Sequence, residues 1–323
     1  MDIFDSLRPT IIQIHEELQK SVQDSFPRTL KDPIRYFLET SGKKIRPLLT
    51  LYSCQLVGGD TSHALPAAVA VELFHDFTLI HDDIMDRDTL RRGRPTIHAR
   101  WDEGTAILVG DALIGMAYQN LLKSTTPHLS RLVTHFSEAL IKVCEGQALD
   151  KEFEQRSEVS VSEYLDMISK KTAWLFRLSC QLGGIIGQAS ESELEALIEF
   201  GYHVGMGFQI QDDLLDFVAD QSKLGKSVGS DWKLDKKTYV TLKYQEKLSS
   251  HPELSRQYPA NIWDFSSFQE LQHALYSLHI VEETQQVAEQ YFRTAIAALE
   301  RVHPLNEQNT IFQIVEFLRH RQF

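Results

Sequence analysis

Two segments of the chain place aspartates at the same spacing. Residues 79–86 read LIHDDIMD and residues 209–216 read QIQDDLLD, so each contains the pattern D-D-x-x-D. The outer aspartates of each pattern are four residues apart, and on an α-helix they lie on one face, about 6 Å apart along the axis. Like charges at this spacing repel each other, and bound cations remove the repulsion. The carboxylates predicted to bind metal are Asp82, Asp83, Asp86, Asp212, Asp213 and Asp216.

The ligand chemistry of these clusters favours one kind of ion. Carboxylate oxygens are hard ligands, and neither cluster has a cysteine or a group of histidines beside it. Mg²⁺ commonly binds through one or two carboxylates together with substrate phosphates. A single cluster of this kind also occurs as the polar stripe of an exposed helix, but both clusters here are surrounded by Ile, Leu, Met and Phe. We therefore predict that the two clusters hold a diphosphate through Mg²⁺.

A diphosphate also requires positive charge from the protein, and several cations stand at informative positions. Lys43 and Arg46 lie in SGKKIRP at the predicted start of a helix, where free backbone N–H groups also favour anions. The other candidates follow the two clusters or lie in the middle of the chain: Arg91, Arg92, Lys171 beside Thr172, Lys226 and Lys236. Arginine suits bidentate contact with phosphate, and lysine acts as a point charge.

The histidines near the first cluster leave other interpretations open. Glu72-x-x-His75 is the pattern of di-iron helical bundles, but those sites need two such pairs and only one is found. The pairs His75-Asp76 and His81-Asp82 also resemble all-helical His-Asp phosphohydrolases. That interpretation explains the histidines but neither the second aspartate cluster nor the basic residues.

The elements that must position these residues are predicted to be long helices. The 323 residues include only 16 glycines and 10 prolines, and few turns in a long chain favour long elements. Apolar residues recur at helical spacing in most windows, and strand alternation is nearly absent. The predicted helices are 1–21, 44–57, 64–88, 103–123, 128–155, 161–188, 191–220, 235–249 and 280–301. The predicted fold class is all-α, as a single domain over residues 1–323.

Composition excludes several classes of protein. A net charge of −12 argues against a nucleic-acid binder, which needs a basic surface. Three scattered cysteines predict neither a disulfide framework nor a zinc site and are typical of the reducing cytoplasm. The N-terminal segment predicts no signal or transit peptide. The most apolar stretch, residues 104–122, carries Asp111 in its middle and predicts a buried helix rather than a transmembrane segment.

The combination of these motifs resembles the trans-type polyprenyl diphosphate synthases, over about residues 40–240. The resemblance rests on residues 42–47, Glu72-x-x-His75, the first aspartate cluster with Arg91-Arg92-Gly93, Lys171-Thr172, the second cluster after Phe208-Gln209, Gly225-Lys226 and Lys236-Lys237-Thr238, in the family's order. It implies a helical bundle of the isoprenoid synthase type with a central apolar cavity. It also implies a homodimer and three Mg²⁺ ions per active site when substrate is bound.

The resemblance assigns a role to each candidate residue. Asp82, Asp86 and Asp212 would be metal ligands, with Asp83, Asp213 and Asp216 in support. Isopentenyl diphosphate would be held by Lys43, Arg46, His75 and Arg92, and the allylic diphosphate by Arg91, Lys171, Lys226 and Lys236. Thr172 and Gln209 would present oxygens to the developing allylic cation. Asp235 departs from the family pattern, because a Gly or Asn is usual before Lys236.

The resemblance also implies the reaction and a product length. The reaction would be head-to-tail condensation of isopentenyl diphosphate with dimethylallyl, geranyl or farnesyl diphosphate. Phe77 and Thr78, five and four residues before Asp82, look like the family's twenty-carbon pattern, so geranylgeranyl diphosphate is the expected product. A terpene cyclase of the same fold remains an alternative, although its second cluster usually reads as a mixed Asn/Ser/Glu pattern. A non-catalytic subunit would be expected to have lost one or both clusters, and both are intact.

Overall fold

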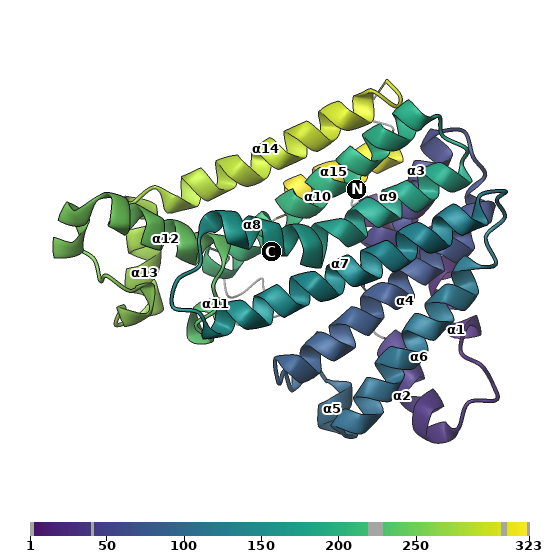
Figure 1. Ribbon diagram of the computed structural model, residues 1–323, viewed down its shortest axis with the longest axis horizontal. Coiled ribbons are helices and arrows are strands. Elements are labelled where there is room, and N and C mark those ends of the chain that lie inside the picture. The colour runs from purple at the N-terminus through teal and green to yellow at the C-terminus, as the bar shows by residue number, and fades with distance from the viewer. Residues whose placement is uncertain (1–2, 40–41, 219–228, 305–308, 322–323) are drawn as a thin grey trace. The chain divides into compact units, whose positions relative to one another are not determined.

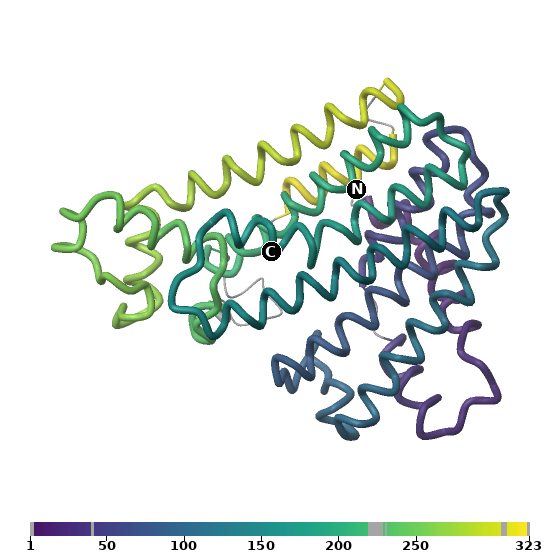
Figure 2. The backbone as a smooth tube through the Cα atoms, viewed as in Figure 1, coloured from purple at the N-terminus to yellow at the C-terminus, as the bar shows by residue number. Residues whose placement is uncertain are grey.

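The computed structural model describes residues 3–39, 42–218, 229–304 and 309–321 (Figure 1). Over these ranges the regular secondary-structure elements are helices, apart from one short hairpin. The all-α prediction is therefore confirmed. Figure 2 shows the same backbone as a tube, in which long helices dominate. Within the described residues, no helix has both the length and the apolar character needed to cross a membrane.

The chain divides into two compact units, each of which is described by itself. Unit 1 comprises Met1–Glu138, Leu175–Gly201 and Ala298–Ile314, and unit 2 comprises Ala139–Trp174, Tyr202–Ala297 and Val315–Phe323. The prediction of a single domain over residues 1–323 stays a prediction.

Unit 1 is organised around the helix that carries the first aspartate cluster, α4 (Thr61–Met85), whose main packing partners are α6 and α3. Most of α4 is buried, including Val69, Leu73 and Phe74. The other helices of the unit are α1 (Ile3–Lys20), α2 (Arg28–Leu38), α3 (Ile45–Leu56), α5 (Ile97–Arg100) and α6 (Glu103–Leu121), together with parts of α7 (Leu129–Gln155), α9 (Trp174–Ile186), α10 (Glu191–Val218), α14 (Ile280–Glu300) and α15 (Thr310–Arg319).

Close helix packing in unit 1 depends on two glycines. A Cβ added to Gly110 of α6 would lie 2.2 Å from Nε2 of His81 on α4, and one added to Gly183 of α9 would lie 2.2 Å from the carbonyl oxygen of Thr50 on α3. Both distances are far below a van der Waals contact. At Gly183 the close atom is backbone, so only glycine leaves room there, whereas at Gly110 a larger residue would require the His81 ring to move.

A two-residue turn follows α4. Strands β1 (Leu90–Arg91) and β2 (Arg94–Pro95) pair antiparallel, with Arg91 opposite Arg94. The turn residues Arg92 and Gly93 have φ angles of 51° and 73°. Two consecutive positive φ angles are the pattern of a type I′ hairpin turn, which often has glycine at its second position. The segment between the predicted helices 64–88 and 103–123 therefore contains a defined hairpin.

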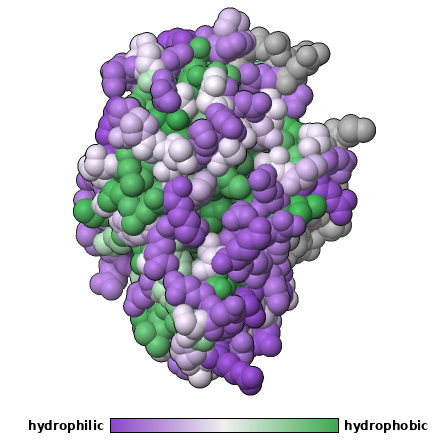
Figure 3. Space-filling view, turned by 90° about the vertical axis from the view of Figure 1, so that its right-hand side faces the viewer, coloured by the Kyte–Doolittle hydropathy of each residue, from purple (hydrophilic) through white to green (hydrophobic). Residues whose placement is uncertain are grey.

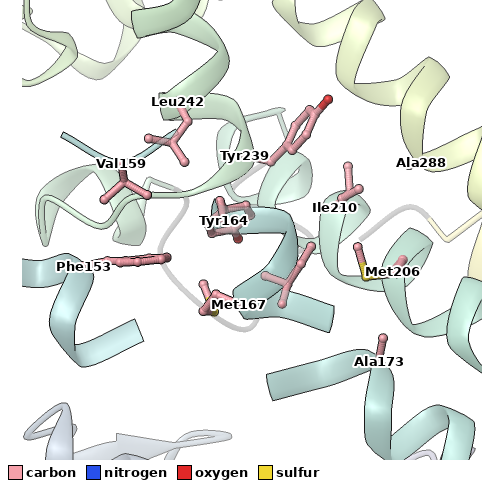
Figure 4. Packing of buried hydrophobic residues seen from close by; sticks show 11 residues of the cluster. Phe153, Val159, Tyr164, Met167, Ala173, Met206, Ile210, Tyr239, Leu242 and Ala288 are labelled. Carbon is pink, nitrogen blue, oxygen red and sulfur yellow. The ribbon is translucent and has the colours of Figure 1, made fainter. Parts of the chain in front are cut away.

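Unit 2 contains two apolar clusters. One gathers side chains of α7, α8 (Val161–Ile168), α10, α12 (Tyr239–Ser250) and α14, with Tyr164, Met167 and Ile210 among its buried members (Figure 4). The other surrounds Phe217 and Tyr244. It includes side chains of α13 (Phe268–Ser277) and of the 3₁₀ turn η3 (Ile262–Asp264). The remaining elements of unit 2 are η1 (Ser169–Ala173), α11 (Ser230–Lys233) and the 3₁₀ turn η2 (Pro252–Arg256).

The observed helices follow most of the predicted ranges, with three kinds of difference. The predicted helix 161–188 is divided, because η1 is a π-helix between α8 and α9. The predicted helix 235–249 begins only at Tyr239, where Thr238 caps α12. Helices α2, α13 and α15 and the one-turn helices α5 and α11 were not predicted. Of these, α2 contains Pro33, a residue that normally argues against a helix interior.

Hydrophilic and hydrophobic residues are interspersed on the face shown in Figure 3. Some large apolar side chains are exposed, among them Ile107 (46% exposed) and Leu108 (62%) on α6. Single exposed apolar residues are normal on a protein surface. Two adjacent ones on a single helix are a candidate contact surface.

We predict that Gly146→Ala destabilises the protein by about 1–3 kcal/mol, as expected for overpacking. A Cβ at this position of α7 would lie 2.3 Å from the backbone nitrogen of Lys171 in η1, and backbone cannot move aside as a flexible side chain can. The free energy of unfolding in urea measures the loss. Glu154→Ala, at an exposed position of the same helix, is the control and should change stability by less than about 0.5 kcal/mol. Equal stability of the two variants would contradict the prediction.

The backbone at Asp235 yields a second stability prediction. Helix α11 ends with hydrogen bonds from Asp235 N–H to Trp232 C=O (3.2 Å) and from Lys236 N–H to Asp231 C=O (2.9 Å), and Asp235 has a φ of 52°. This is a Schellman motif, in which glycine or asparagine usually takes the left-handed position. We expect Asp235→Gly to leave stability within about 0.5 kcal/mol and Asp235→Val to cost about 1–2 kcal/mol. Leu234→Val at the exposed neighbouring position is the control, and urea unfolding of all three variants checks the order.

Candidate active site

The first aspartate cluster lies at the end of α4 in unit 1. The outer carboxylates, Asp82 and Asp86, are half-buried, whereas the side chain of Asp83 is only 2% exposed. Asp83 Oδ1 accepts hydrogen bonds from Nε and Nη2 of Arg91, both at 2.7 Å. Burial raises the pKa of the Asp83 carboxyl, and the bond to Arg91 opposes that rise. Asp83 is therefore held inside the unit by a residue that was predicted to bind the allylic diphosphate.

The second cluster lies on α10 in unit 2 and shows the same division. The side chain of Asp212 is 50% exposed, and Asp216 is half-buried, with its Oδ2 accepting the backbone N–H of Asp231 at 2.9 Å. Asp213 is buried. Burial raises the pKa of the Asp213 carboxyl to about 7, while its hydrogen bonds act in the opposite direction. In both clusters the middle aspartate faces inward and the outer ones are closer to solvent.

A group of basic side chains surrounds His75 in unit 1. Arg46 Nη1 lies 3.2 Å from His75 Nε2, and its guanidinium stacks on the Phe176 ring at 4.4 Å. The guanidinium of Arg92 lies against Gly42, whose added Cβ would be 2.9 Å from Nη1. All four candidates for the isopentenyl diphosphate site, Lys43, Arg46, His75 and Arg92, therefore belong to one unit. Arg46 contacts His75, and Arg92 contacts Gly42, which precedes Lys43 in the chain.

The pKa of His75 reports the electrostatics of this region. Burial, followed by the positive charges of Arg46, Arg92, Lys44 and Arg91, holds the pKa of the His75 imidazole well below its usual value. His75 is therefore neutral at physiological pH. The same positive potential that disfavours an imidazolium stabilises a bound anion.

The sequence pointed to Lys43 as a ligand and gave no role to Lys44. The two lysines have different structural roles. Lys43 is exposed, whereas Lys44 is buried and donates a hydrogen bond from Nζ to Glu72 Oε1 at 2.8 Å. Lys44 has a left-handed backbone with a φ of 52° at the N-terminal cap of α3. Asp76 is buried one turn after Glu72, and burial raises its pKa to about 7. The buried pair Lys44–Glu72 fixes the start of α3 to α4.

Unit 2 holds the mid-chain candidates. Lys171, in the π-helix η1, donates to Asp150 Oδ2 at 2.5 Å. The neighbouring Thr172 hydroxyl donates to Gln209 Oε1 at 2.9 Å, so Thr172 and Gln209 are in direct contact. Lys236 is half-buried, just after the left-handed Asp235. Lys226 lies outside the described residues.

Arg321 is a contact of the second cluster that sequence reasoning missed. Its Nη2 donates to Asp212 Oδ1 at 2.9 Å and to the backbone oxygen of Phe208 at 3.1 Å, and its guanidinium stacks on the Phe208 ring at 4.1 Å. More than one hundred residues separate Arg321 from Asp212, so no local spacing points to this pair. Arg321 offsets part of the negative charge of the second cluster.

The arrangement of the aspartate carboxylates can be compared with the ligands that a hard divalent cation such as Mg²⁺ requires. Among the described residues, no group of three or more His, Cys, Asp or Glu side chains is arranged to hold a metal ion by itself. The outer pairs Asp82–Asp86 and Asp212–Asp216 each offer carboxylates one helical turn apart at the more exposed side of the cluster. Carboxylate oxygens and substrate phosphates are the ligands that Mg²⁺ prefers, so the outer aspartates fit this ion.

The two residues predicted to set product length lie one turn or more before Asp82 on α4. Phe77 is half-buried and packs edge-on against the ring of His81, with the ring centroids 4.8 Å apart. The Thr78 hydroxyl donates to the backbone oxygen of His75 at 2.8 Å. Their part in product length stays a prediction.

Comparison with known proteins agrees with this arrangement of motifs. The family model described as polyprenyl synthetase matches residues 27–278. A short chain isoprenyl diphosphate synthase of Methanothermobacter thermautotrophicus is 42% identical over 250 residues, which cover 77% of each chain. A geranylgeranyl diphosphate synthase of Sulfolobus acidocaldarius is 35% identical over 308 residues, covering 94% of this chain and 93% of the relative.

The fold is likewise similar to a solved structure. The geranylgeranyl pyrophosphate synthetase of Pyrococcus horikoshii superposes with a TM-score of 0.90 at 35% identity, covering 99% of this chain and 98% of the other. Sequence, motif order and fold therefore agree, and the chain belongs to the polyprenyl synthetase family.

Proposed function

We propose that this protein joins isopentenyl diphosphate head to tail with an allylic diphosphate and forms a short-chain all-trans polyprenyl diphosphate. The observation that carries the proposal is the repeated aspartate cluster. In each unit a long helix carries, near its end, two outer aspartates closer to solvent and one anchored aspartate. Membership of the polyprenyl synthetase family supports the same reaction. The comparisons give no support to a terpene cyclase or a His-Asp phosphohydrolase.

Mg²⁺ is the proposed cofactor, with three ions per active site when substrate is bound. The outer aspartates Asp82, Asp86, Asp212 and Asp216 would hold it, together with the substrate phosphates. The bound ions would neutralise the charge that develops on the leaving diphosphate. Asp83 and Asp213 would support the outer ligands from behind, through the contacts described above.

The basic region around His75 is the proposed site for isopentenyl diphosphate. Lys43, Arg46 and Arg92 would bind its phosphates, and neutral His75 can donate a hydrogen bond without adding charge. This binding orients the isopentenyl double bond for attack on the allylic carbon, and orientation of two reactants is itself a large part of the rate enhancement.

The allylic diphosphate would be held by Arg91, Lys171 and Lys236, with Lys226 as a further ligand. As the allylic C–O bond breaks, electrons pass to the diphosphate and positive charge develops on the allylic carbons. Oxygens of Thr172 and Gln209 would stabilise that charge. The isopentenyl double bond then attacks, and the departed diphosphate takes the proton that is lost. Apolar walls of a central cavity would exclude the water that would otherwise capture the cation.

The expected product is geranylgeranyl diphosphate. Phe77 lies five residues before Asp82, about 7.5 Å toward the start of α4, where it would close the channel below the growing chain. The relatives from Sulfolobus acidocaldarius and Pyrococcus horikoshii are named as synthases of this twenty-carbon compound, which supports the same product here.

We also propose a homodimer in the cytoplasm. The adjacent exposed side chains Ile107 and Leu108 of α6 are apolar surface suited to contact with a second copy. The three cysteines, Cys54, Cys144 and Cys180, all lie in the described part of the chain and form no disulfide there, as is usual in a reducing compartment.

We predict that Asp82→Ala and Asp212→Ala each lower kcat by about a hundredfold or more, because each removes a ligand that acts on the leaving diphosphate. Turnover is measured with labelled isopentenyl diphosphate, each allylic diphosphate and Mg²⁺, and circular dichroism checks that the helices persist. Asp264→Ala, at an exposed carboxylate of η3, is the matched control and should keep full activity. Near-normal condensation by either cluster variant would rule out the proposed function.

Phe77→Ala is expected to lengthen the product beyond twenty carbons, because removal of the ring deepens the space available to the growing chain. Chromatography of the dephosphorylated products measures their length. Phe292→Ala, which removes a fully buried ring from α14 in unit 2, controls for general loss of packing and should leave product length unchanged. An unaltered length in Phe77→Ala would show that another residue stops elongation.

A further inference from the structure

A chain of hydrogen bonds that includes Asp213 connects four elements of unit 2, and its bonds are buried at Tyr164 and Tyr239 and partly buried at Gln209 and Thr172. Asp213 Oδ2 accepts the hydroxyl of Tyr164 at 2.5 Å and the backbone N–H of Tyr239 at 2.9 Å, and Oδ1 accepts the amide of Gln209 at 2.9 Å. Gln209 Oε1 in turn accepts the hydroxyl of Thr172 at 2.9 Å. The chain therefore runs from α8 and the start of α12 through α10 to the π-helix η1.

Burial gives these bonds their importance. Tyr164 and Asp213 are each 3% exposed, and Thr172 is 8% exposed. Figure 4 shows Tyr164 among the apolar side chains of its cluster, with Met167 and Ile210 nearby. In such surroundings water cannot replace a missing partner, so each donor must meet an acceptor within the protein.

The direction of the chain follows from the groups at its inner end. A backbone N–H can only donate, so the Tyr239 amide requires an acceptor at Asp213 Oδ2. That bond also satisfies one of the free N–H groups in the first turn of α12, where negative charge is favoured. The side chain of Gln209 donates from its NH₂ group to Asp213 Oδ1, and this orientation turns its oxygen toward Thr172.

This direction decides what Thr172 can offer to a substrate. A threonine hydroxyl has one proton and two lone pairs. Because the proton is donated to Gln209, the lone pairs are what Thr172 retains for another partner. Gln209 Oε1 uses one of its two lone pairs to accept this proton, so Thr172 Oγ1, which keeps both of its lone pairs, has the greater capacity to face positive charge.

We propose that Tyr164 is a positioning residue for prenyl transfer: together with the Tyr239 amide it holds Asp213, so that Gln209 and Thr172 keep the one hydrogen-bond direction in which Thr172 presents its lone pairs to the developing allylic cation. The inference rests on the proposed function and adds a residue to it. The hydroxyl of Tyr164 is donated to Asp213 and not to a substrate or a metal ion in this proposal. It acts through Asp213, the middle aspartate of the second cluster.

The unit contains a matched control for this proposal. Tyr244 is also a buried tyrosine, and its hydroxyl donates to the backbone oxygen of Pro259 at 2.6 Å in the other apolar cluster. Tyr164→Phe and Tyr244→Phe therefore remove the same atom and one short hydrogen bond each, which is buried at Tyr164 and partly buried at Tyr244. Only the first of these bonds belongs to the chain that ends at Thr172.

The first experiment compares wild type, Tyr164→Phe and Tyr244→Phe by urea unfolding and by steady-state kinetics with the allylic diphosphate. We expect similar shifts of the unfolding midpoint in the two variants. We expect kcat to fall about tenfold or more in Tyr164→Phe alone, with KM for the allylic diphosphate changed less than about twofold. Equal kcat values in the two variants would overturn the proposal, as would a loss confined to KM.

The second experiment tests the direction of the bonds. Asp213→Asn alone lets the Gln209 amide turn over and reverses the bonds, so that Thr172 accepts from Gln209 instead of donating to it. Gln209→Glu alone places two carboxylates opposite each other. Both single variants should lower kcat. The double variant restores the order. Its new amide at position 213 can accept from Tyr164 and Tyr239 and donate to the new carboxylate at position 209, whose other oxygen accepts from Thr172. We expect the double variant to exceed both single variants in kcat. Losses that simply multiply would overturn the proposal.

Failure of this inference can be told apart from failure of the proposed function. A wild-type protein that condenses no allylic diphosphate in the presence of Mg²⁺ refutes the proposed function and the inference with it. An active wild type whose Tyr164→Phe variant matches Tyr244→Phe refutes the inference alone.

Discussion

The middle aspartate of each cluster is anchored inside its own unit, and the rest of the site depends on this constraint. Arg91 holds Asp83, and Tyr164, the Tyr239 amide and Gln209 hold Asp213. Successive residues of an α-helix point about 100° apart, so fixing the middle side chain fixes the rotation of the helix end. The outer aspartates are thereby directed to the more exposed side of each cluster.

Buried charge has a second role in unit 1. The pair Lys44–Glu72 is almost completely removed from solvent, which is costly unless both partners are retained. It connects the start of α3 to the middle of α4, the two segments that carry Arg46 and His75. The cations around His75 are thus kept close together although they repel each other. A bound phosphate group would offset this repulsion with its negative charge.

Much of this site could be predicted from the sequence, because its information is local. The spacing of Asp82 and Asp86 indicates a shared helix face, and the low content of glycine and proline indicates long helices. The assignment of Arg46 and His75 to one site came from the family resemblance, and the structure places them in contact. The start of α12 was missed because the residues before it, Asp235 to Lys237, have an ordinary helical composition while Asp235 has a left-handed backbone.

Other features depend on tertiary contacts that no spacing reveals. Lys43 and Lys44 fit the sequence pattern equally well. Their different roles depend on the left-handed backbone of Lys44, whose side chain is buried against Glu72. The contact of Arg321 with Asp212 joins distant parts of the chain. Tyr164 reads as an apolar position of α8 until its hydroxyl is seen to meet a carboxylate, since hydrophobic periodicity treats tyrosine as core.

The π-helix η1 has a consequence for how this segment of the chain can change. A π-turn accommodates one residue more than an α-turn, so η1 can be regarded as an insertion that α8 and α9 absorb without breaking. Removal of one residue between Ser169 and Ala173 would convert it to a regular turn and rotate all that follows by about 100°. Lys171 and Thr172 would then leave their acceptors together. The length of this segment is therefore as tightly specified as the identity of its side chains.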